Sequence, residues 1–214
     1  MDIWIFGAGG HATSVLEVAR AAGYTPRGFI DPFAPEETLH GMPVHADIPG
    51  APDAQFAAVV AIGDNTVREK VVTKSIAAHP NMMLPALVHP SAVVAQNATI
   101  GRGTVVFQTA VIGSACQVGA FCVINTTASL DHECTVENYA SIAPRGTLGG
   151  RVYVGPHAFL GIASTVLQNR RIGPGVVVGG ASLVTRDLNT PGGYWGVPAS
   201  LRKSAEDMRG FLAS

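Results

Sequence analysis

A six-residue repeat is the feature of this sequence that most restricts its fold. From Val88 to Val184 every sixth residue is Val, Ile or Leu, without a break in phase. Glycine often occupies the next position, and small residues recur four positions after the aliphatic one. An α-helix has a period of 3.6 residues, so this pattern predicts short strands alternating with tight turns. Hexapeptide repeats are typical of a parallel β-helix, here with three hexads in each triangular coil of eighteen residues.

The cysteines follow the same repeat. Cys116, Cys122 and Cys134 all occupy its small-residue position. We therefore expect buried packing residues rather than nucleophiles, since a reactive thiol needs a neighbouring base. An odd count without a CxxC pair indicates a reducing compartment.

The first 85 residues carry a different pattern. An apolar strand at 3–6 leads through glycines at 7–10 into a helix that ends at Gly23, and a strand follows near 28–30. A further strand at 57–62 and a helix at 65–78 complete a βαβ layout, which predicts a small parallel, Rossmann-like sheet. Glycines between a strand and a helix let backbone N–H groups approach a phosphate. We expect a mononucleotide here, with Asp31 accepting from its ribose or base; the alternative is a glycine turn without a ligand.

The predicted organisation has three parts. Residues 1–85 form a Rossmann-like nucleotide-sugar-binding domain of α/β class, and residues 86–190 form the all-β solenoid. Residues 191–214 form a C-terminal loop and a short helix at about 200–212, which caps the open end of the solenoid.

Polar residues interrupt the composition of the repeat at one place without disturbing its phase. Asn125, Asp131 and Glu137 occupy positions where glycine is usual, and the pair His132-Glu133 lies among them. Local departures of this kind are expected at functional sites.

Coil geometry gives His132 a specific neighbour. Gly150 follows it by eighteen residues (132 + 18 = 150), so adjacent coils bring the two within roughly 5 Å. A histidine beside an exposed amide can act as a general base next to an oxyanion donor. Glu133 would then fix the tautomer of the imidazole. The alternative is an ordinary corner histidine.

Composition excludes several function classes. Lys plus Arg is 14 and Asp plus Glu is 15, giving a net charge of −1 that argues against nucleic acid as a partner. No apolar run approaches the roughly 20 residues of a membrane helix, and the N-terminus does not resemble a signal peptide, so we expect a cytoplasmic protein with no membrane partner. No trio of histidines has zinc-ligand spacing, so we expect no metal.

Seven segments resemble the hexapeptide-repeat sugar O- and N-acetyltransferases, a family that includes sialic acid O-acetyltransferases and the bacillosamine-pathway and perosamine N-acetyltransferases. They are IFGAGGHA at 5–12, FIDP at 29–32, AIGDN at 61–65, NTTASLDHEC at 125–134, FLGIAST at 159–165, VVGGASLV at 177–184 and GVPA at 196–199.

The resemblance implies a left-handed β-helix, a homotrimer, and acetyl-CoA as co-substrate in the grooves between neighbouring solenoids. It implies that His132 is the general base, Glu133 its partner, and the Gly150 N–H the group that polarises the thioester carbonyl. Ile162 and Gly180 match positions that line the CoA channel. Close relatives often have a histidine that contacts the acyl donor where this chain has Ser141.

The same resemblance implies which residues bind the acceptor substrate. Asn125 matches a polar residue near the sugar. The positions that match those holding a nucleotide-activated sugar are Gly9, Gly10, His11, Asp31 and Gly63.

The expected reaction is transfer of an acetyl group from acetyl-CoA to the amine of a nucleotide-linked amino-deoxy sugar, with a 4-amino-4,6-dideoxy sugar as the leading candidate. Two alternatives stay open at this point: O-acetylation of a sugar such as sialic acid, and a non-catalytic nucleotide-binding trimer. The sequence does not distinguish UDP, GDP and dTDP, nor the stereochemistry of the sugar.

Overall fold

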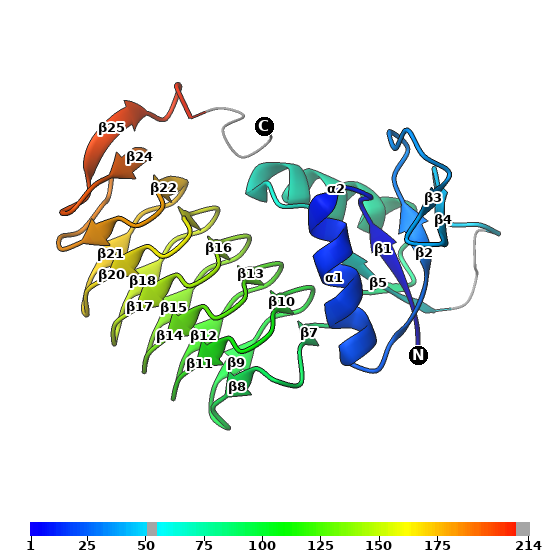
Figure 1. The fold of residues 1–214 in the computed structure, drawn as a ribbon, viewed down its shortest axis with the longest axis horizontal. Helices are drawn as coiled ribbons and strands as arrows, with labels where there is room; N and C mark the ends of the chain where they lie inside the picture. Colours follow the sequence, from blue (N-terminus) through cyan, green and yellow to red (C-terminus); the bar gives the residue numbers. More distant parts are fainter. Residues whose placement is uncertain (51–54, 209–214) are drawn as a thin grey trace.

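The protein consists of a small α/β sheet beside a solenoid of stacked coils (Figure 1). The computed structural model describes residues 1–50 and 55–208. The predicted fold class, an α/β N-terminal region followed by a parallel β-helix, is confirmed.

Parallel strands form most of the N-terminal sheet, in the order β3-β4-β2-β1-β5-β6. Among the strands that the structure describes in this sheet, β3 alone runs antiparallel to its neighbour, β4. The strands are β1 (Asp2–Phe6), β2 (Thr25–Ile30), β3 (Thr38–Leu39), β4 (Met42–His45), β5 (Phe56–Val60) and β6 (Met82–Met83). β3, β4 and β6 are short strands that the sequence analysis did not predict.

Alternation along β1 explains why both faces of this sheet are covered. Ile3 and Ile5 pack with helix α1 (Gly10–Ala21), whereas Phe6 packs with helix α2 (Asn65–Ala78). Side chains alternate between the two faces of a strand, so a strand buried on both faces reads as a continuous apolar run. This is the pattern of residues 3–6.

The solenoid has three parallel sheets, one along each side of the triangle. The first contains β7 (Leu87–Val88), β10 (Val105–Val106), β13 (Val123–Ile124), β16 (Ser141–Ile142), β19 (Phe159–Leu160) and β22 (Val176–Val178). The second contains β8 (Val93–Val94), β11 (Val111–Ile112), β14 (Ser129–Leu130), β17 (Thr147–Leu148), β20 (Thr165–Val166) and β23 (Leu183–Val184). The third contains β9 (Thr99–Ile100), β12 (Gln117–Val118), β15 (Thr135–Val136), β18 (Tyr153–Val154) and β21 (Arg171–Ile172).

Neighbouring strands pair in a constant register of eighteen residues. Leu130 pairs with Leu148, and that residue pairs with Val166. The aliphatic residues of the repeat point inward and are buried from Val106 onward. Burial of this continuous apolar column is the main stabilising term of the solenoid.

The cysteines are buried beside this column, as predicted. Burial raises the pKa of each thiol, to about 11 for Cys122 and about 12 for Cys134. The Cys116 Sγ donates to the Asp131 carbonyl at 2.8 Å. These thiols therefore pack the interior and are not nucleophiles.

Non-glycine residues in the left-handed backbone region form most corners. Glu133 (φ 59°) and Arg151 (φ 58°) are examples, and each lies one position before a buried residue, Cys134 and Val152 respectively. This conformation is unfavourable by roughly 1–2 kcal/mol for an L-residue. Hydrogen bonds between coils hold it, such as Glu133 N–H to the Ser114 carbonyl at 2.8 Å.

The predicted C-terminal helix at about 200–212 is wrong over its first residues. Residues 200–204 form strand β25 (Ser200–Ser204), which pairs antiparallel with β24 (Gly192–Trp195) instead of forming a helix. β24 in turn pairs with β22, so this hairpin extends the first solenoid sheet. Tertiary pairing overrides local helix propensity here. The last part of the predicted helix, 209–212, lies outside the described residues.

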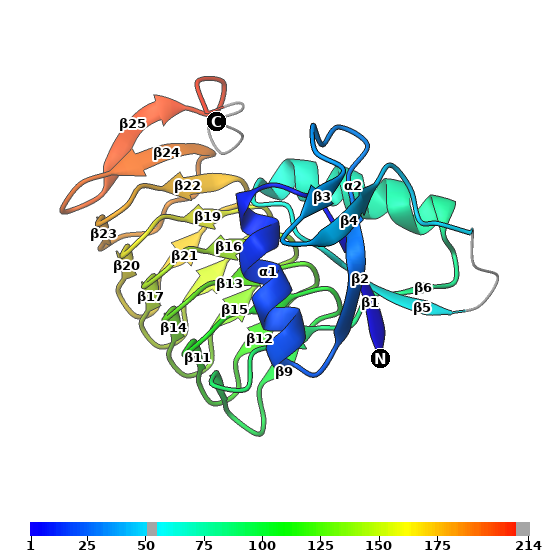
Figure 2. The same cartoon turned by 45° about the vertical axis from the view of Figure 1, so that its right-hand side comes forward.

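The two parts of the molecule share an interface along the first solenoid sheet. Figure 2 shows α1 against the strands of the solenoid, and it packs on β7 and β10. Outward-facing Val105, Phe107 and Val123 join the same apolar cluster as α1.

Arg68 of α2 connects the two parts through buried polar contacts. Its side chain is 1% exposed. It donates to the carbonyls of Ile62, Gly63, Phe121 and Tyr139 at 2.9–3.1 Å, and to Asn65 Oδ1 at 2.7 Å. Burial lowers its pKa to about 10, so the guanidinium stays charged at neutral pH.

Replacing this arginine tests the interface. We expect Arg68→Ala to lower the free energy of unfolding by about 3 kcal/mol or more, because several buried carbonyls lose a charged donor. Denaturant unfolding measures the change. The control is Arg27→Ala, which removes an exposed ion pair with Asp2 and should change stability by less than about 1 kcal/mol. Equal losses in the two variants would contradict the assigned role of Arg68.

Candidate active site

The corner between the second and third solenoid sheets brings His132 onto Gly150. His132 follows β14, and Gly150 follows β17 one coil later. A methyl group on Gly150 would lie 2.5 Å from His132 Nε2 and 2.6 Å from Cε1. The imidazole thus lies directly against the glycine, and a side chain at position 150 would displace it.

Glu133 holds the other nitrogen of the ring. His132 Nδ1 lies 2.9 Å from Glu133 Oε2. A carboxylate at this position accepts from Nδ1–H, which leaves Nε2 unprotonated in the neutral ring. The hydrogen bond from His132 lowers the pKa of Glu133, with a further contribution from Arg151. The side chain of His132 is 44% exposed, so the ring lies at the surface of this corner.

Arg151 extends this arrangement along the corner. Its Nη1 lies 3.5 Å from Glu133 Oε2, and its Nε donates to Asn169 Oδ1 at 2.8 Å. Asn169 lies one coil further on (151 + 18 = 169), so the same register that stacks His132 on Gly150 fixes the guanidinium. The sequence analysis missed Arg151, although its place one coil after Glu133 could have indicated it.

The backbone N–H of Gly150 completes the group. Within residues 1–50 and 55–208, no acceptor is hydrogen-bonded to it, whereas the Gly150 carbonyl accepts from Asn169 N–H at 2.9 Å. A free amide beside a neutral imidazole can stabilise an oxyanion while the ring removes a proton.

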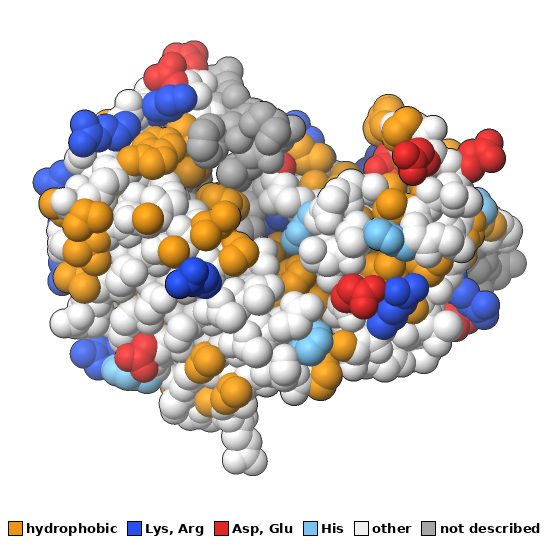
Figure 3. All heavy atoms as spheres, viewed as in Figure 1, with side chains coloured by type: hydrophobic (Ala, Val, Ile, Leu, Met, Phe, Trp, Pro, Cys, Tyr) orange, Lys and Arg blue, Asp and Glu red, His pale blue; other side chains and the backbone are white. Residues whose placement is uncertain are grey.

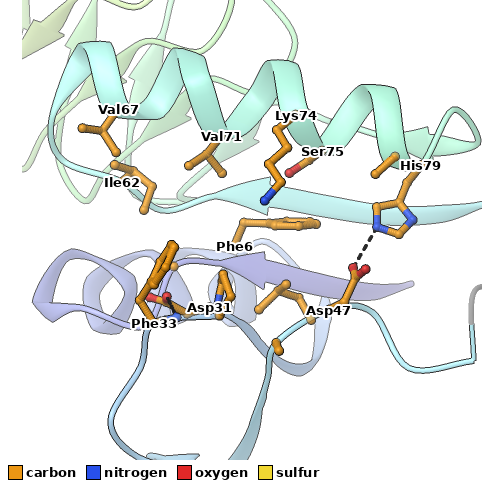
Figure 4. Close-up of a pocket in the computed structure, with 15 residues that line it drawn as sticks. Phe6, Asp31, Phe33, Asp47, Ile62, Val67, Val71, Lys74, Ser75 and His79 are labelled. Atoms are coloured by element: carbon orange, nitrogen blue, oxygen red, sulfur yellow. Dashed lines mark hydrogen bonds and ion pairs between the residues drawn. The ribbon is translucent and has the colours of Figure 1, made fainter.

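A second candidate site is a pocket of about 440 Å³ in the α/β part. It lies between α2 and the ends of β1 and β2 (Figure 4). Ligands of open α/β sheets bind at this edge, outside the carboxyl ends of the strands. Apolar side chains make most of the wall, and the polar lining residues include Asp31, Asp47, Lys74 and His79.

The predicted nucleotide-binding glycines lie near this edge. Gly9 precedes α1 and Gly10 begins it, and neither has a neighbour within 4 Å on its open side. Gly63 is similarly open. Asp31 lines the pocket, and its carboxylate accepts from Ala8 N–H and from Phe33 N–H, both at 3.0 Å. It therefore connects the glycine turn to the loop after β2.

His11 is directed away from solvent. Its ring lies 5.7 Å from that of Phe107, and burial lowers its pKa to about 4. Its Nε2 is buried without a hydrogen-bond partner among the described residues.

The remaining predicted residues lie elsewhere on the solenoid. Asn125, Ile162 and Gly180 share the corner between the first and second sheets. Asn125 Oδ1 accepts from Thr126 N–H at 2.7 Å, and Ile162 is 60% exposed. The structure does not bring them to His132 within one chain.

Ser141 occupies a structural position. It is 3% exposed, and its hydroxyl donates to Asn65 Oδ1 at 2.6 Å and accepts from Arg68 at 3.2 Å. Since α2 covers it, the structure does not place it where an acyl donor could touch it. We therefore leave Ser141 out of the candidate site.

The described residues contain no group of three or more His, Cys, Asp or Glu side chains that could hold a metal ion. No helix in this part of the chain is long and apolar enough to cross a membrane. On the face drawn in Figure 3 the charged side chains are scattered, and neither sign gathers into a patch.

Comparison with known proteins identifies the family. The PglD N-terminal domain matches residues 2–75. A histidine variant of perosamine N-acetyltransferase from Caulobacter crescentus, in complex with CoA and GDP-perosamine, is 33% identical over 95% of this chain and 98% of that chain, with a TM-score of 0.89. The chain belongs to the hexapeptide-repeat sugar acetyltransferases. It is therefore an acyltransferase, as predicted.

Two further structures agree in fold with this hexapeptide-repeat acetyltransferase. The acetyltransferase domain of PglB from Neisseria gonorrhoeae, in complex with acetyl coenzyme A, is 29% identical over 94% of this chain and 98% of that one, with a TM-score of 0.85. WeeI from Acinetobacter baumannii is 23% identical over 94% of this chain and all of that one, with a TM-score of 0.79, and shares the fold.

Adding a methyl group at Gly150 tests the geometry of the corner. We expect Gly150→Ala to keep the fold, because the three atoms nearest to the added methyl group belong to the His132 side chain and not to the backbone, and to lower kcat. Activity and thermal unfolding should be measured on the same preparation. A Gly150→Ala/His132→Ala double variant should lose little more than His132→Ala alone, because the two residues act as a unit. If the losses in activity of the two single variants simply added in the double variant, the contact between His132 and Gly150 would be contradicted.

The buried histidine predicts a pH effect on stability. The pKa of His11 is about 4 in the folded chain and about 6.5 when exposed, so its contribution is complete above pH 6.5 and is lost as pH falls towards 4. The midpoint of urea unfolding should fall less steeply over this range in His11→Gln than in the parent chain. Parallel profiles would show that His11 is not buried in its neutral form.

Proposed function

We propose that this enzyme transfers an acetyl group from acetyl-CoA to the amine of a nucleotide-linked amino-deoxy sugar. The observation that carries the proposal is the contact of His132 with Gly150, with Glu133 on the opposite nitrogen of the ring. The complex of the Caulobacter relative with CoA and GDP-perosamine supports the choice of co-substrate and acceptor.

The reaction is a direct transfer. The neutral sugar amine attacks the thioester carbon while His132 Nε2 takes the proton from the nitrogen, a step worth roughly 10²–10⁴-fold. The Gly150 N–H stabilises the negative charge that develops on the carbonyl oxygen. The C–S bond then breaks, the amide forms, and the thiolate of CoA leaves and takes up a proton from the imidazolium. Glu133 stabilises the imidazolium between these steps.

The acceptor that this arrangement favours is a 4-amino-4,6-dideoxy sugar. Perosamine, the sugar bound by the Caulobacter relative, supports this class. Asn125 would lie near the sugar. Gly9, Gly10, Asp31 and Gly63 would surround its nucleotide, and the buried His11 would support the glycine turn from behind.

We further propose that the enzyme is a homotrimer. The α/β part covers the first solenoid sheet, whereas His132 lies at the corner opposite that sheet. One chain therefore separates its nucleotide pocket from its candidate base. A neighbouring chain would bring a pocket to this base and would provide the corner of Ile162 and Gly180 as a wall for CoA. We also propose that the enzyme works in the cytoplasm, where acetyl-CoA and nucleotide sugars are made.

Removing the imidazole tests the mechanism. We expect His132→Ala to lower kcat by roughly 10²–10⁴-fold with a modest change in KM. The imidazole accepts the proton only while the C–N bond forms, so its loss affects the transition state more than substrate binding. The assay follows CoA release from acetyl-CoA with a GDP-linked 4-amino-4,6-dideoxy sugar, and the 4-hydroxy analogue serves as a comparison.

A matched control is His89→Ala, which removes a half-buried histidine from a different solenoid corner, where it is bonded to Ser91. It should keep full activity. An unchanged kcat in His132→Ala would remove this histidine from the mechanism. Faster turnover of the hydroxy sugar than of the amino sugar would change the assignment to O-acetylation.

A further inference from the structure

We propose that the pocket beneath α2 selects guanine as the base of the nucleotide sugar, with Asp47 and Lys74 reading the edge of the ring. This inference rests on the proposed function, because it assigns a base to the nucleotide of that acceptor. Neither residue belongs to the glycine turn or to the segments that carry the family resemblance.

Two opposite walls of the pocket are suited to binding a flat aromatic ring. Phe33 lines it and is 89% exposed, which is unusual for a large aromatic side chain. Figure 4 places Phe33 on one side of the cavity opposite Ile62 and Val67 on the other. An aromatic face opposite aliphatic side chains favours a base stacked between them. At about 440 Å³ the cavity has room for a purine.

The far end of the same cavity carries a cation and an anion. The ammonium group of Lys74 points from α2 into the space above Phe6 (Figure 4). Asp47 Oδ1 is 3.0 Å from His79 Nε2 and accepts from Ile48 N–H at 2.8 Å. Its second oxygen, Oδ2, has no hydrogen-bond partner among the described residues. The carboxylate is thus held in place with one oxygen available.

Nearby donors keep Asp47 ionised. The Ile48 N–H, then His79 and Lys74, lower the pKa of its carboxyl. At neutral pH the pocket therefore offers a carboxylate acceptor beside an ammonium donor.

Guanine matches this pair of groups better than uracil, thymine or adenine. Its edge carries the O6 acceptor next to the N1–H and N2–H donors, so O6 can accept from an ammonium while the N–H groups donate to a carboxylate. Uracil and thymine present one N–H between two carbonyl oxygens, and a carboxylate would repel those oxygens. Adenine has no N–H at N1.

The position of the polar pair also fits the rest of a nucleotide. Asp31 and Gly7 line the opposite end of the pocket, where β1 and β2 end. A base at Asp47 and Lys74 would place its ribose near Asp31 and its phosphates near the N-terminus of α1, which favours anions.

A panel of nucleotides tests the assignment by binding alone. Titration calorimetry on the full chain should use GDP, IDP, ADP, UDP and dTDP. We expect GDP to bind most tightly. IDP lacks the N2 amine and should bind roughly 10-fold or more weakly, which is the loss of one hydrogen bond to a charged group. Equal affinity for GDP and UDP would overturn the proposal.

Variants locate the selectivity. Asp47→Asn should remove the preference for GDP over IDP. Lys74→Met should weaken the binding of GDP without changing the stability of the protein, because Lys74 lies on an exposed face of α2. Phe33→Ala should weaken the binding of all five nucleotides to the same extent. The control is Lys70→Met, an exposed lysine one turn earlier on α2 that does not line the pocket. A GDP preference that survives in both Asp47→Asn and Lys74→Met would exclude the pocket as its source.

The assay separates this inference from the function on which it rests. Acetyl transfer to UDP- or dTDP-linked amino sugars at least as fast as to the GDP-linked sugar would overturn guanine selection and keep the acetyltransferase. No transfer to any nucleotide-linked amino sugar would overturn the proposed function. Absence of binding by every nucleotide in the panel would overturn the pocket assignment itself.

Discussion

Every feature of the candidate active site depends on the constant register of eighteen residues between neighbouring coils. Inward aliphatic side chains maintain that register, because slipping by one residue would turn the apolar column outward. The register stacks the imidazole of His132 on Gly150, and it places Arg151 one coil beyond Glu133 and next to Asn169. Chemistry at the corner is thus fixed by hydrophobic packing in the interior. A rigid scaffold of this kind holds a base and an amide in place before the substrate arrives, which is a requirement of electrostatic catalysis.

A second constraint joins the α/β part to the solenoid. The guanidinium of Arg68 bonds to carbonyls on both sides of the interface, and Ser141 and Asn65 complete the buried network. This network fixes α2, whose other face forms the wall of the pocket with Lys74. The pocket and the candidate base are therefore each rigidly held, but on different sides of one chain. An assembly that brings two chains together at the solenoid corners would unite them.

Much of the solenoid could be predicted from the sequence, because its period is strict and the inward residues are all aliphatic. The contact between His132 and Gly150 followed from the same arithmetic. Arg68 could not be predicted, since a charged residue on a helix is normally exposed and only the folded interface provides its carbonyl partners. Ser141 was placed by resemblance to relatives, and the covering helix α2 was not visible from that position. Strand β25 was taken for a helix because its pairing with β24 depends on tertiary contacts. Asp47 and Lys74 lie far apart in sequence, so nothing local indicated that they share a cavity.

A crystal structure of the enzyme with CoA and a GDP-linked 4-amino-4,6-dideoxy sugar would test the central claim most directly. The account predicts that the CoA sulfur lies at the corner of His132 and Gly150, with the Gly150 N–H directed at the position of the thioester carbonyl oxygen. It also predicts that the sugar nitrogen lies about 2.6–3.2 Å from His132 Nε2, within reach for proton transfer. A sulfur bound at another corner of the solenoid, or a sugar nitrogen facing a different side chain, would contradict it.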